Sequence, residues 1–498
     1  MNFTPVAVRE AELSHPVAGI DAGPEYGSAL VLARWYSEPL ALVDVPLRDG
    51  QADAEQVARS LWPSVQRLAA ARLAADGATR LARQTPALAG AGTAADTVPS
   101  TDTVPSTDTV PSTEAVPSTD ADPAGCRPGH PAGRARRARA AVPGFPAEML
   151  TSGLRLSWPP AYLLGRATVL RNAPAVSVIV CTRDRADKLP ACLAAVLVQE
   201  YPDFEVIVVD NAPADDAVAD LVARLNAAGT RGVPLRRVVE PRPGLSWARN
   251  TGLAAASGAV VAYLDDDEHP DRHWLAELAR GFALGQRVAG VSGLVLPAAL
   301  ETPAQRLYEE FGGHSKGRGF SHAVFDQASH ARQHPLYPLP AFGVGASMAF
   351  DRAALTGIGG FDVALGAGTP AMAGEDTAAI ADVMLAGGTF VYWPGAVMWH
   401  QHRQTLPEME AQLNGYGSGL TAFYTRAVLR DPRRLATLAR LAPRALRDLG
   451  GGDSVRTATM SADYPASLRR ASRSGMLAGP ARYLRSRRLQ AKLKGELA

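Results

Sequence analysis

Between residues 176 and 403, short apolar runs alternate with segments in which apolar residues recur every three or four positions. This alternation is typical of βα units and predicts a largely parallel sheet with helices on its faces. The strands expected in the first half of this region cover 176–181, 205–209, 235–239 and 260–264. The helices expected there cover 187–199, 217–228, 247–256 and 274–284. Ser246 is the expected N-cap of the third helix, and Ser257-Gly258 should end it.

The first 88 residues show a different pattern, which predicts a small α+β accessory domain. A β-rich stretch at 28–45 contains a turn signal at 37–39, so it should form two strands. From 52 to 81 the apolar residues take helical spacing, as at Val57, Leu61 and Val65. No pattern in these residues points to chemistry, so we interpret them as a packing or docking module.

Residues 89–150 are predicted to form a disordered linker. Positions 91–140 contain no aromatic residue and no Leu, Ile or Met, so they cannot bury enough apolar surface to offset chain entropy. A six-residue unit recurs there from Thr97 onward, as TVPSTD, TVPSTD, TVPSTE and AVPSTD. Four short polar units are too few to stack as a β-helix, and extended polyproline II character is expected instead. The linker ends in a basic run at 134–139, which we interpret as solvated, with anion binding as the alternative.

Composition and charge narrow the class of protein. The chain has 498 residues, enough for about three domains at ~150 residues each. Its formal net charge of +2 argues against a protein that binds nucleic acid over its whole surface, and no nucleic-acid partner is expected. The balance conceals a basic region, because residues 426–498 contain 17 Lys and Arg but only 5 Asp and Glu. This region is expected to be helical.

Cysteine usage and hydropathy bear on the compartment. The chain has three cysteines and no CxxC, which argues against a disulfide scaffold or a zinc knuckle and fits a reducing compartment. The first 16 residues lack the basic start and apolar core of a signal peptide. The longest apolar stretch, at 288–300, is too short to span a bilayer. These features predict a cytoplasmic protein, with peripheral contact at the inner face of the membrane as a further expectation.

The strongest chemical signal is the acidic run Asp265-Asp266-Asp267-Glu268, directly after the apolar strand 260–264. Ligands of open parallel sheets bind just beyond the carboxyl ends of the strands. Clustered carboxylates at that position need a cation to relieve their repulsion, and oxygen ligands favour Mg²⁺ or Mn²⁺. The alternative is an acidic loop that only caps the following helix, with Asp271 at its start.

Two further segments could complete such a site. Glu375-Asp376 opens a helix expected at 377–385 and follows the Gly-rich loop 365–369. Carboxylates are favoured at helix N-termini, so on its own this pair is ordinary helix-start chemistry. His400 and His402 follow a strand expected at 390–393 and would share one face of an extended segment. His400 is a candidate metal ligand, although a lone histidine there is more often structural.

The first strands carry candidate nucleotide-binding residues. Thr182, Arg183 and Arg185 follow the first strand, Asp210 ends the second, and Arg249 lies in the first turn of a helix. Hydroxyl, guanidinium and helix N-terminal groups all suit a phosphate or a nucleotide. Neither GxGxxG after the first strand nor GxxxxGK[ST] occurs, which disfavours dinucleotide-binding and P-loop proteins.

Taken in order, these segments resemble family 2 glycosyltransferases of the inverting kind, which have the GT-A fold. The matching segments are VSVIVCTRDR (176–185), FEVIVVDNA (204–212), PGLSWARNTGLAAASG (243–258), VVAYLDDDE (260–268), GIGGFDVALGAGTPAMAGED (357–376) and VYWPGAVMWHQHR (391–403). The resemblance covers about residues 174–425 and implies a GT-A catalytic domain at 151–425. It implies nothing about residues 1–150.

The resemblance also implies a role for each matching residue. The family's DxD motif falls on Asp265 and Asp267. The resemblance implies that Asp265 faces the ribose or the metal, that Asp267 ligates the metal, and that His400 is a third metal ligand. Because Asp266 and Glu268 flank the motif, the ligand set stays open by one position. Asp376 would be the catalytic base, with Glu375 supporting the acceptor hydroxyl. The remaining matches imply contacts to the donor by Thr182, Arg183, Arg185, Asp210, Arg249 and Asp266.

The implied reaction is a metal-assisted single displacement from a nucleotide-diphosphate sugar to the hydroxyl of a glycan, lipid-linked or small-molecule acceptor. Two other functions remain open. A nucleotidyltransferase would need a Gly-rich loop after the first strand, and 181–185 contains no glycine. A catalytically inactive scaffold for membrane or RNA would not need Asp267, Asp376 and His400.

The basic C-terminal region adds a possible partner. Segments 468–476 and 481–493 place arginines on one side of helices that contain Leu and Tyr. Such helices suit an anionic membrane surface or a lipid-phosphate acceptor. The alternative is a solvated helical cap on the catalytic domain.

Overall fold

The computed structural model describes residues 3–84, 148–156, 159–285, 287–315, 317–338, 341–450, 460–461 and 463–496. Almost all of the predicted linker, including the six-residue repeats and the basic run at 134–139, lies outside the described residues. Residues 1–69 and 145–498 form one compact unit, and residues 70–144 form a second. The predicted domain boundaries at 88, 150 and 425 stay predictions.

The N-terminal residues form a three-stranded sheet. Its strands are β1 (Val6–Glu12), β3 (Ser28–Trp35) and β4 (Glu38–Pro46), with β1 parallel and β4 antiparallel to β3. Short strands β2 (Ile20–Asp21) and β5 (Gln51–Ala52) pair beside it, and α1 (Ala54–Gln84) follows. The turn expected at 37–39 lies earlier, because Tyr36 and Ser37 both have positive φ, of 50° and 64°. Two left-handed residues match the twist of a two-residue hairpin loop, so β4 begins at Glu38.

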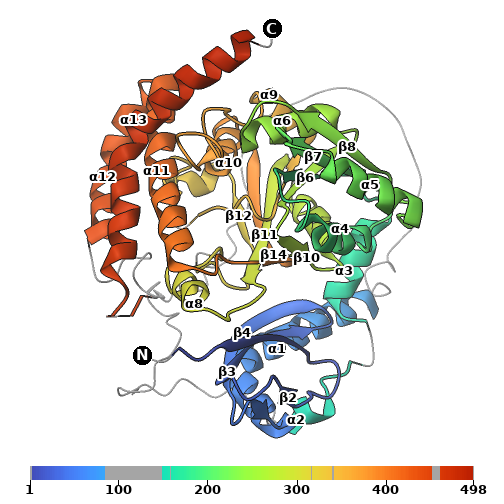
Figure 1. The fold of residues 1–498 in the computed structure, drawn as a ribbon. Coiled ribbons are helices and arrows are strands. Elements are labelled where there is room, and N and C mark those ends of the chain that lie inside the picture. Colours follow the sequence, from blue (N-terminus) through green and yellow to red (C-terminus); the bar gives the residue numbers. More distant parts are fainter. Residues whose placement is uncertain are drawn as a thin grey trace, which may run out of the picture. The chain divides into compact units, whose positions relative to one another are not determined.

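A nine-stranded sheet forms the centre of the unit (Figure 1). Its order is β10-β14-β11-β13-β9-β6-β7-β8, with β12 paired to β14. The strands are β6 (Val176–Thr182), β7 (Phe204–Asn211), β8 (Leu235–Glu240), β9 (Val260–Asp265), β10 (Glu268–Pro270), β11 (Val288–Pro297), β12 (Ala323–Phe325), β13 (Met348–Asp351) and β14 (Thr389–His400). β6, β7, β8, β9, β11 and β14 run in one direction, and β10, β12 and β13 in the other. The prediction of a mostly parallel α/β sheet is therefore confirmed.

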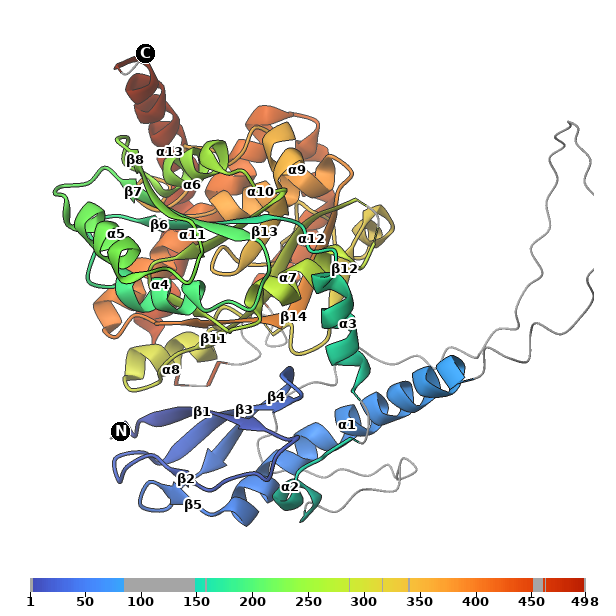
Figure 2. The ribbon, with the colours of Figure 1, turned by 90° about the vertical axis from the view of Figure 1, so that its right-hand side faces the viewer.

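Helices cover both faces of this sheet (Figure 2). They include α3 (Ala161–Leu170), α4 (Leu189–Leu197), α5 (Ala217–Ala228), α6 (Leu245–Ala255), α7 (Trp274–Phe282), α9 (Arg352–Gly357) and α10 (Glu375–Leu385). The chain also forms α8 (Pro303–Glu310) and a 3₁₀ turn at Gln327–Ala331. The short helix α2 (Glu148–Ser152) lies beside the N-terminal residues instead, where the Leu150 carbonyl accepts from the Val17 N–H across 3.0 Å. Alternate β6 residues face opposite sides, with Val178 packing toward α4, α5 and α7 and Ile179 toward α6, α9 and α10. Burial on both faces explains why the strands are continuous apolar runs in the sequence.

The expected N-cap at Ser246 is wrong. Helix α6 begins at Leu245, with Gly244 before it at φ +138°. Only glycine adopts this backbone angle readily, so Gly244 lets the chain turn sharply into the helix. The Ser246 hydroxyl is fully buried and donates to the carbonyl of Leu365 across 2.8 Å. It therefore joins the helix to the Gly-rich loop.

The C-terminal region contains α11 (Leu406–Arg430), α12 (Arg434–Gly450) and α13 (Ala466–Glu496). Helices α11 and α13 pack closely through small residues, since a Cβ at Gly475 would lie 2.0 Å from the Asn414 carbonyl oxygen. The two C-terminal segments expected at 468–476 and 481–493 form one helix, with Pro480 inside it. Proline cannot donate to the carbonyl four residues earlier, at Met476. The Thr421 hydroxyl of α11 donates to that carbonyl across 2.8 Å instead.

Among the described residues, none of the helices has the length and apolar character needed to cross a membrane.

Candidate active site

A cavity of about 880 Å³ opens at the carboxyl ends of β6, β7 and β9. The sheet topology brings these ends together, because β6 pairs in parallel with both β7 and β9. The N-terminus of α10, the end of β14 and parts of α8 and α11 form the other side. Every predicted site residue except Asp210 lines this cavity. The cavity therefore collects residues from segments that lie far apart in the sequence, such as Thr182 and His400.

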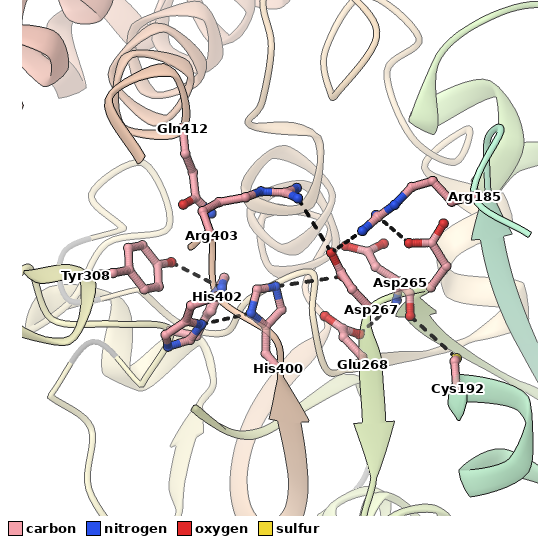
Figure 3. Close-up of polar contacts among 12 residues, drawn as sticks. Arg185, Cys192, Asp265, Asp267, Glu268, Tyr308, His400, His402, Arg403 and Gln412 are labelled. Atoms are coloured by element: carbon pink, nitrogen blue, oxygen red, sulfur yellow. Dashed lines mark hydrogen bonds and ion pairs between the residues drawn. The ribbon is translucent and has the colours of Figure 1, made fainter. Parts of the chain in front are cut away.

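Strand pairing places His400 beside the acidic run. Strand β10 pairs antiparallel with β14, and Glu268 lies directly opposite His400 in this register. His400 Nε2 lies 3.9 Å from Asp267 Oδ1, and ligand atoms of Asp267, Glu268 and His400 lie within 4.8 Å of one another (Figure 3). Burial lowers the pKa of His400 to about 3, so its imidazole is neutral near pH 7 and keeps a lone pair.

Glu268 only flanks the sequence motif, but the structure places it among the possible metal ligands. Its side chain is fully buried, and its Oε2 accepts from the Asp265 backbone N–H across 2.8 Å. Its Oε1 is buried and has no hydrogen-bond partner within the described chain. Burial, together with the charges of Asp265 and Asp267, raises its pKa well above the usual range. A buried carboxylate oxygen without a partner is costly unless a proton or a cation satisfies it.

Asp265 and Asp266 make other contacts. Asp265 Oδ1 accepts from Arg249 Nη2 across 3.2 Å. Asp266 accepts from the Thr182 hydroxyl across 2.8 Å and from Arg185 Nη1 across 2.5 Å. Burial raises the pKa of Asp266 to about 7 even though Arg185 and Thr182 oppose the shift. Arg185 also donates to Asp267 across 2.9 Å, so one guanidinium bridges two neighbouring carboxylates.

Glu375 and Asp376 are fixed at the start of α10. Gly374 precedes them with φ +95°, and a Cβ there would lie 2.6 Å from the Gly419 carbonyl oxygen of α11. Glu375 accepts from Arg249 Nη1 across 2.7 Å, and burial raises its pKa to about 7. Asp376 Oδ2 accepts from the Gly345 N–H across 2.8 Å, and Asp376 Oδ1 accepts from the Thr377 N–H across 2.6 Å. Both backbone donors orient the Asp376 carboxylate at the cavity wall.

Asp210 lies outside the cavity. Its fully buried carboxylate pairs with Arg237 of β8, with Oδ2 2.8 Å from Nε and 2.7 Å from Nη2. The neighbouring Asn211 lines the cavity and holds the chain before α6 by accepting from the Gly244 N–H across 2.9 Å. Arg183 lines the cavity with a side chain that is about half exposed.

The sequence motifs missed the wall that α8 and α11 contribute. Tyr308 of α8 lies with its hydroxyl 3.2 Å from that of Tyr416 of α11 and 3.1 Å from His314 Nε2. Arg403, just after β14, lies 3.9 Å from Asp267 Oδ2. Tyr308, His314 and Tyr416 belong to segments without a recognisable motif, whereas Arg403 ends the matching segment 391–403 but was not singled out.

The central sheet is a mixed α/β sheet, and clustered carboxylates and a histidine surround a cavity at the ends of its strands. This arrangement is typical of proteins that bind a ligand at the carboxyl edge of an open sheet. Residues 177–355 match the family model described as glycosyl transferase family 2. Over these residues, about a third of the chain, the sequence is similar to that family.

The chain is also similar to named glycosyltransferases, each over only part of that protein's length. The glycosyltransferase AglE of Haloferax volcanii is 36% identical over 104 residues, which are 20% of this chain and 33% of that protein. The pre-mycofactocin glycosyltransferase of Mycobacterium tuberculosis is 30% identical over 190 residues, 37% of this chain and 35% of that protein. The chain thus spans about a third of these relatives. A solved mannosyltransferase from Pyrobaculum calidifontis, in complex with GDP-Man and Mn²⁺, has a TM-score of 0.43 and 19% identity, with coverage of 65% of this chain and 96% of that chain.

Proposed function

We propose that this protein is an inverting glycosyltransferase, which transfers a sugar from a nucleotide-diphosphate sugar to an acceptor hydroxyl by a single displacement with Asp376 as the base. One observation carries the proposal: the three aspartates of the acidic run, His400 and the Glu375-Asp376 pair all line one cavity. Arg249 contacts both groups of carboxylates, Asp265 on one side and Glu375 on the other.

The residues present fit a divalent cation. Asp267, Glu268 and His400 offer two carboxylates and a neutral imidazole, and Glu268 Oε1 is a buried oxygen without a partner in the described chain. This donor set suits Mn²⁺ or Mg²⁺, with the nitrogen ligand favouring Mn²⁺. A cation bound there would neutralise negative charge on the diphosphate leaving group. Asp265, also predicted as a ligand from the motif, accepts a hydrogen bond from Arg249 through its Oδ1, and its role as a ligand stays a prediction.

The remaining residues bind, orient and accept a proton. Arg183 and Arg185 offer guanidinium groups for the donor's phosphates on the side of β6. Asp376 Oδ1 accepts from both the N–H and the hydroxyl of Thr377, whereas Oδ2 accepts only from the Gly345 N–H. Oδ2 therefore keeps a lone pair that can take the proton of an acceptor hydroxyl. Glu375 lies beside Asp376 but is held by Arg249, so the two carboxylates have different hydrogen-bond partners.

We also propose that α13 contacts an anionic membrane surface. Leu468, Gly475 and Tyr483 are buried on one face of this helix. The opposite face exposes 86% of Leu477 and carries the exposed residues Arg473, Leu484, Arg485, Arg487 and Arg488. Exposed leucines among arginines match the chemistry of an anionic lipid interface.

A donor screen tests the transferase function. Purified full-length protein is incubated with UDP-, GDP- and dTDP-sugars with Mn²⁺, with Mg²⁺ or with EDTA, and released nucleoside diphosphate is measured. We expect release with at least one donor that depends on the metal and is lost in Asp267→Asn. If no donor turns over under any condition, with or without a panel of glycan acceptors, the transferase proposal is wrong.

A further inference from the structure

A continuous line of side chains runs from the candidate metal ligands into α8. His400 Nε2 faces Asp267 Oδ1 at 3.9 Å, and His400 Nδ1 lies 2.9 Å from His402 Nδ1 (Figure 3). On the far side, His402 Nε2 lies 2.7 Å from Glu309 Oε1. The His402 side chain is 1% exposed and that of Glu309 is 24% exposed. His402 is therefore enclosed between His400 and a carboxylate.

These distances fix where the protons lie. A carboxylate only accepts hydrogen bonds, so His402 Nε2 must carry the proton that it shares with Glu309. When this is the only proton on the ring, His402 Nδ1 can only accept. The facing Nδ1 of His400 must therefore donate, and this leaves His400 Nε2 with a bare lone pair toward Asp267 and the cavity. A neutral imidazole with a free nitrogen is the form that ligates a metal.

The surrounding structure holds Glu309 in place. Helix α8 begins with a capping box between Thr302 and Gln305, and the Gln305 amide also reaches the His402 carbonyl oxygen at 3.5 Å. Gly313 has φ +50°, and a Cβ there would lie 2.4 Å from Glu309 Oε1. The carboxylate can occupy its position only because residue 313 lacks a side chain. The Tyr308 ring packs edge-on against His402, with centroids 4.7 Å apart.

We propose that Glu309 and His402 are positioning residues, which hold His400 in the tautomer protonated at Nδ1 so that its Nε2 ligates the divalent cation. This inference rests on the metal site of the proposed function. Carboxylate–histidine–metal chains are a general device for orienting a ligand, and loss of the outer partner typically weakens metal binding about 10- to 100-fold. Here the chain is one histidine longer, so α8 acts on the metal site through two imidazoles.

The test measures metal binding and tautomer separately. Metal-free full-length protein is titrated with Mn²⁺, and free Mn²⁺ is followed by electron paramagnetic resonance. We expect Glu309→Ala to raise the Kd for Mn²⁺ about 10- to 100-fold, and Glu309→Gln to fall between, because its amide oxygen can still accept from His402. Glu310→Ala, the next residue along α8, should bind like the wild type. Asp267→Asn should abolish binding and so identify the site.

Gly313→Ala provides a second way to displace the carboxylate if Glu309→Ala does not fold. It should weaken Mn²⁺ binding in the same direction as Glu309→Ala. In metal-free protein labelled with ¹⁵N-histidine, we expect the Nδ1–H tautomer for His400 in the wild type. Glu309→Ala should shift His400 toward Nε2–H.

The possible failures are distinguishable. If the wild type binds Mn²⁺ but folded Glu309→Ala and Gly313→Ala bind it within twofold of the wild type, the positioning role is wrong and the metal site stands. A wild-type His400 found as Nε2–H overturns the positioning role in the same way. If the wild type binds no Mn²⁺, the metal site of the proposed function is wrong and the positioning role is lost with it.

Discussion

Arg249 Nη1 donates to Glu375 Oε1 across 2.7 Å, and this ion pair joins α6 to the first residue of α10. Side-chain exposure is 2% for Arg249 and 8% for Glu375. Arg249 Nη2 reaches Asp265 Oδ1 at 3.2 Å, so one buried guanidinium ties the start of the acidic run to the proposed catalytic pair. Only a planar guanidinium, with several N–H donors, can reach both carboxylates at once. The single ammonium group of a lysine cannot replace it.

Arg249→Lys should therefore damage both stability and activity. A lysine keeps the charge but can satisfy only one of the two carboxylates. Breaking such a buried pair costs about 3 kcal/mol, which we expect as a loss in the free energy of unfolding in urea. Any transferase activity should fall as well. Arg272→Lys is the control, since Arg272 is 66% exposed and pairs with Glu200 on the surface. Equal stability for the two variants would contradict this interpretation of Arg249.

Asp376→Asn should abolish transfer and spare donor binding. Asparagine keeps the size of the side chain and one acceptor oxygen for the Gly345 N–H, but it cannot take up a proton. We expect kcat to fall about 1,000-fold, as for loss of a general base. Donor binding, measured by calorimetry with the nucleotide sugar found in the donor screen, should change by less than about threefold. Loss of donor binding would reassign Asp376 to the donor site.

Glu375 should set the pH dependence of activity. Burial raises its pKa to about 7 from the usual 4.5, so below pH 7 it is largely protonated and its ion pair with Arg249 is weakened. We expect kcat/KM to rise with pH through about 7 and then level off. In Glu375→Gln this rising limb should disappear, leaving a lower and flatter profile from about pH 5.5 to about pH 8. A limb near pH 7 that persists in the variant would assign the titration to another group.

The sequence best predicted the site residues that directly follow a single apolar strand. Asp265, Asp267 and Arg185 each follow an apolar strand, and parallel pairing of β6 with β9 necessarily brings such ends together. Periodicity likewise located the strands and helices of this half to within a few residues. These features need only local pattern and the common direction of the strands.

The sequence did not predict the side-chain contacts that depend on strand register or on the packing of the later helices. Glu268 meets His400 only because β10 pairs with β14 in one particular register. His402 and Glu309 come together because α8 packs against the end of β14, and no sequence motif predicts that contact. Asp210 pairs with Arg237 rather than facing the cavity, a choice set by which face of β7 it occupies.

Glu205 should stabilise the edge of the parallel sheet in a pH-dependent way. Burial alone would raise its pKa, but hydrogen bonds from Ser257, Ser177 and Arg236 outweigh burial and lower the pKa to about 2 from 4.5. A carboxyl group whose pKa is lower in the folded state stabilises the protein above pH 4.5, and this contribution is lost as pH falls toward 2. The full shift corresponds to about 3 kcal/mol, which screening by the nearby solvent reduces to about 2 kcal/mol.

Glu205→Gln should therefore lower the free energy of unfolding by about 2 kcal/mol at pH 7. The difference between variant and wild type should shrink steadily as the pH falls from 4.5 toward 2. Urea denaturation at about pH 7, 4 and 3 measures this. Asp203→Asn, two residues earlier, is the control for a nearby exposed carboxyl group. A difference that is independent of pH would indicate that the loss comes from packing rather than from the charge.

The exposed face of α13 should bind anionic vesicles. Leu477 is 86% exposed, and Arg485, Arg487 and Arg488 are exposed on the same helix, while its other face is fixed to α11. Full-length protein should pellet with phosphatidylserine-containing vesicles at low salt and not with phosphatidylcholine alone. Because each arginine near the surface contributes about 1 kcal/mol and salt screens it, binding should weaken sharply at about 0.5 M salt.

Charge reversal separates this membrane contact from a general effect of positive charge. The double variant Arg487→Glu, Arg488→Glu should lose most of the binding, and Leu477→Ser should weaken it further by removing the apolar contact. Reversal of the exposed Arg224 and Arg231, in and just after α5, is the matched control and should leave binding intact. Protein that stays in the supernatant with anionic vesicles at low salt would show that α13 only caps the catalytic domain, because its buried face alone already explains its packing on α11.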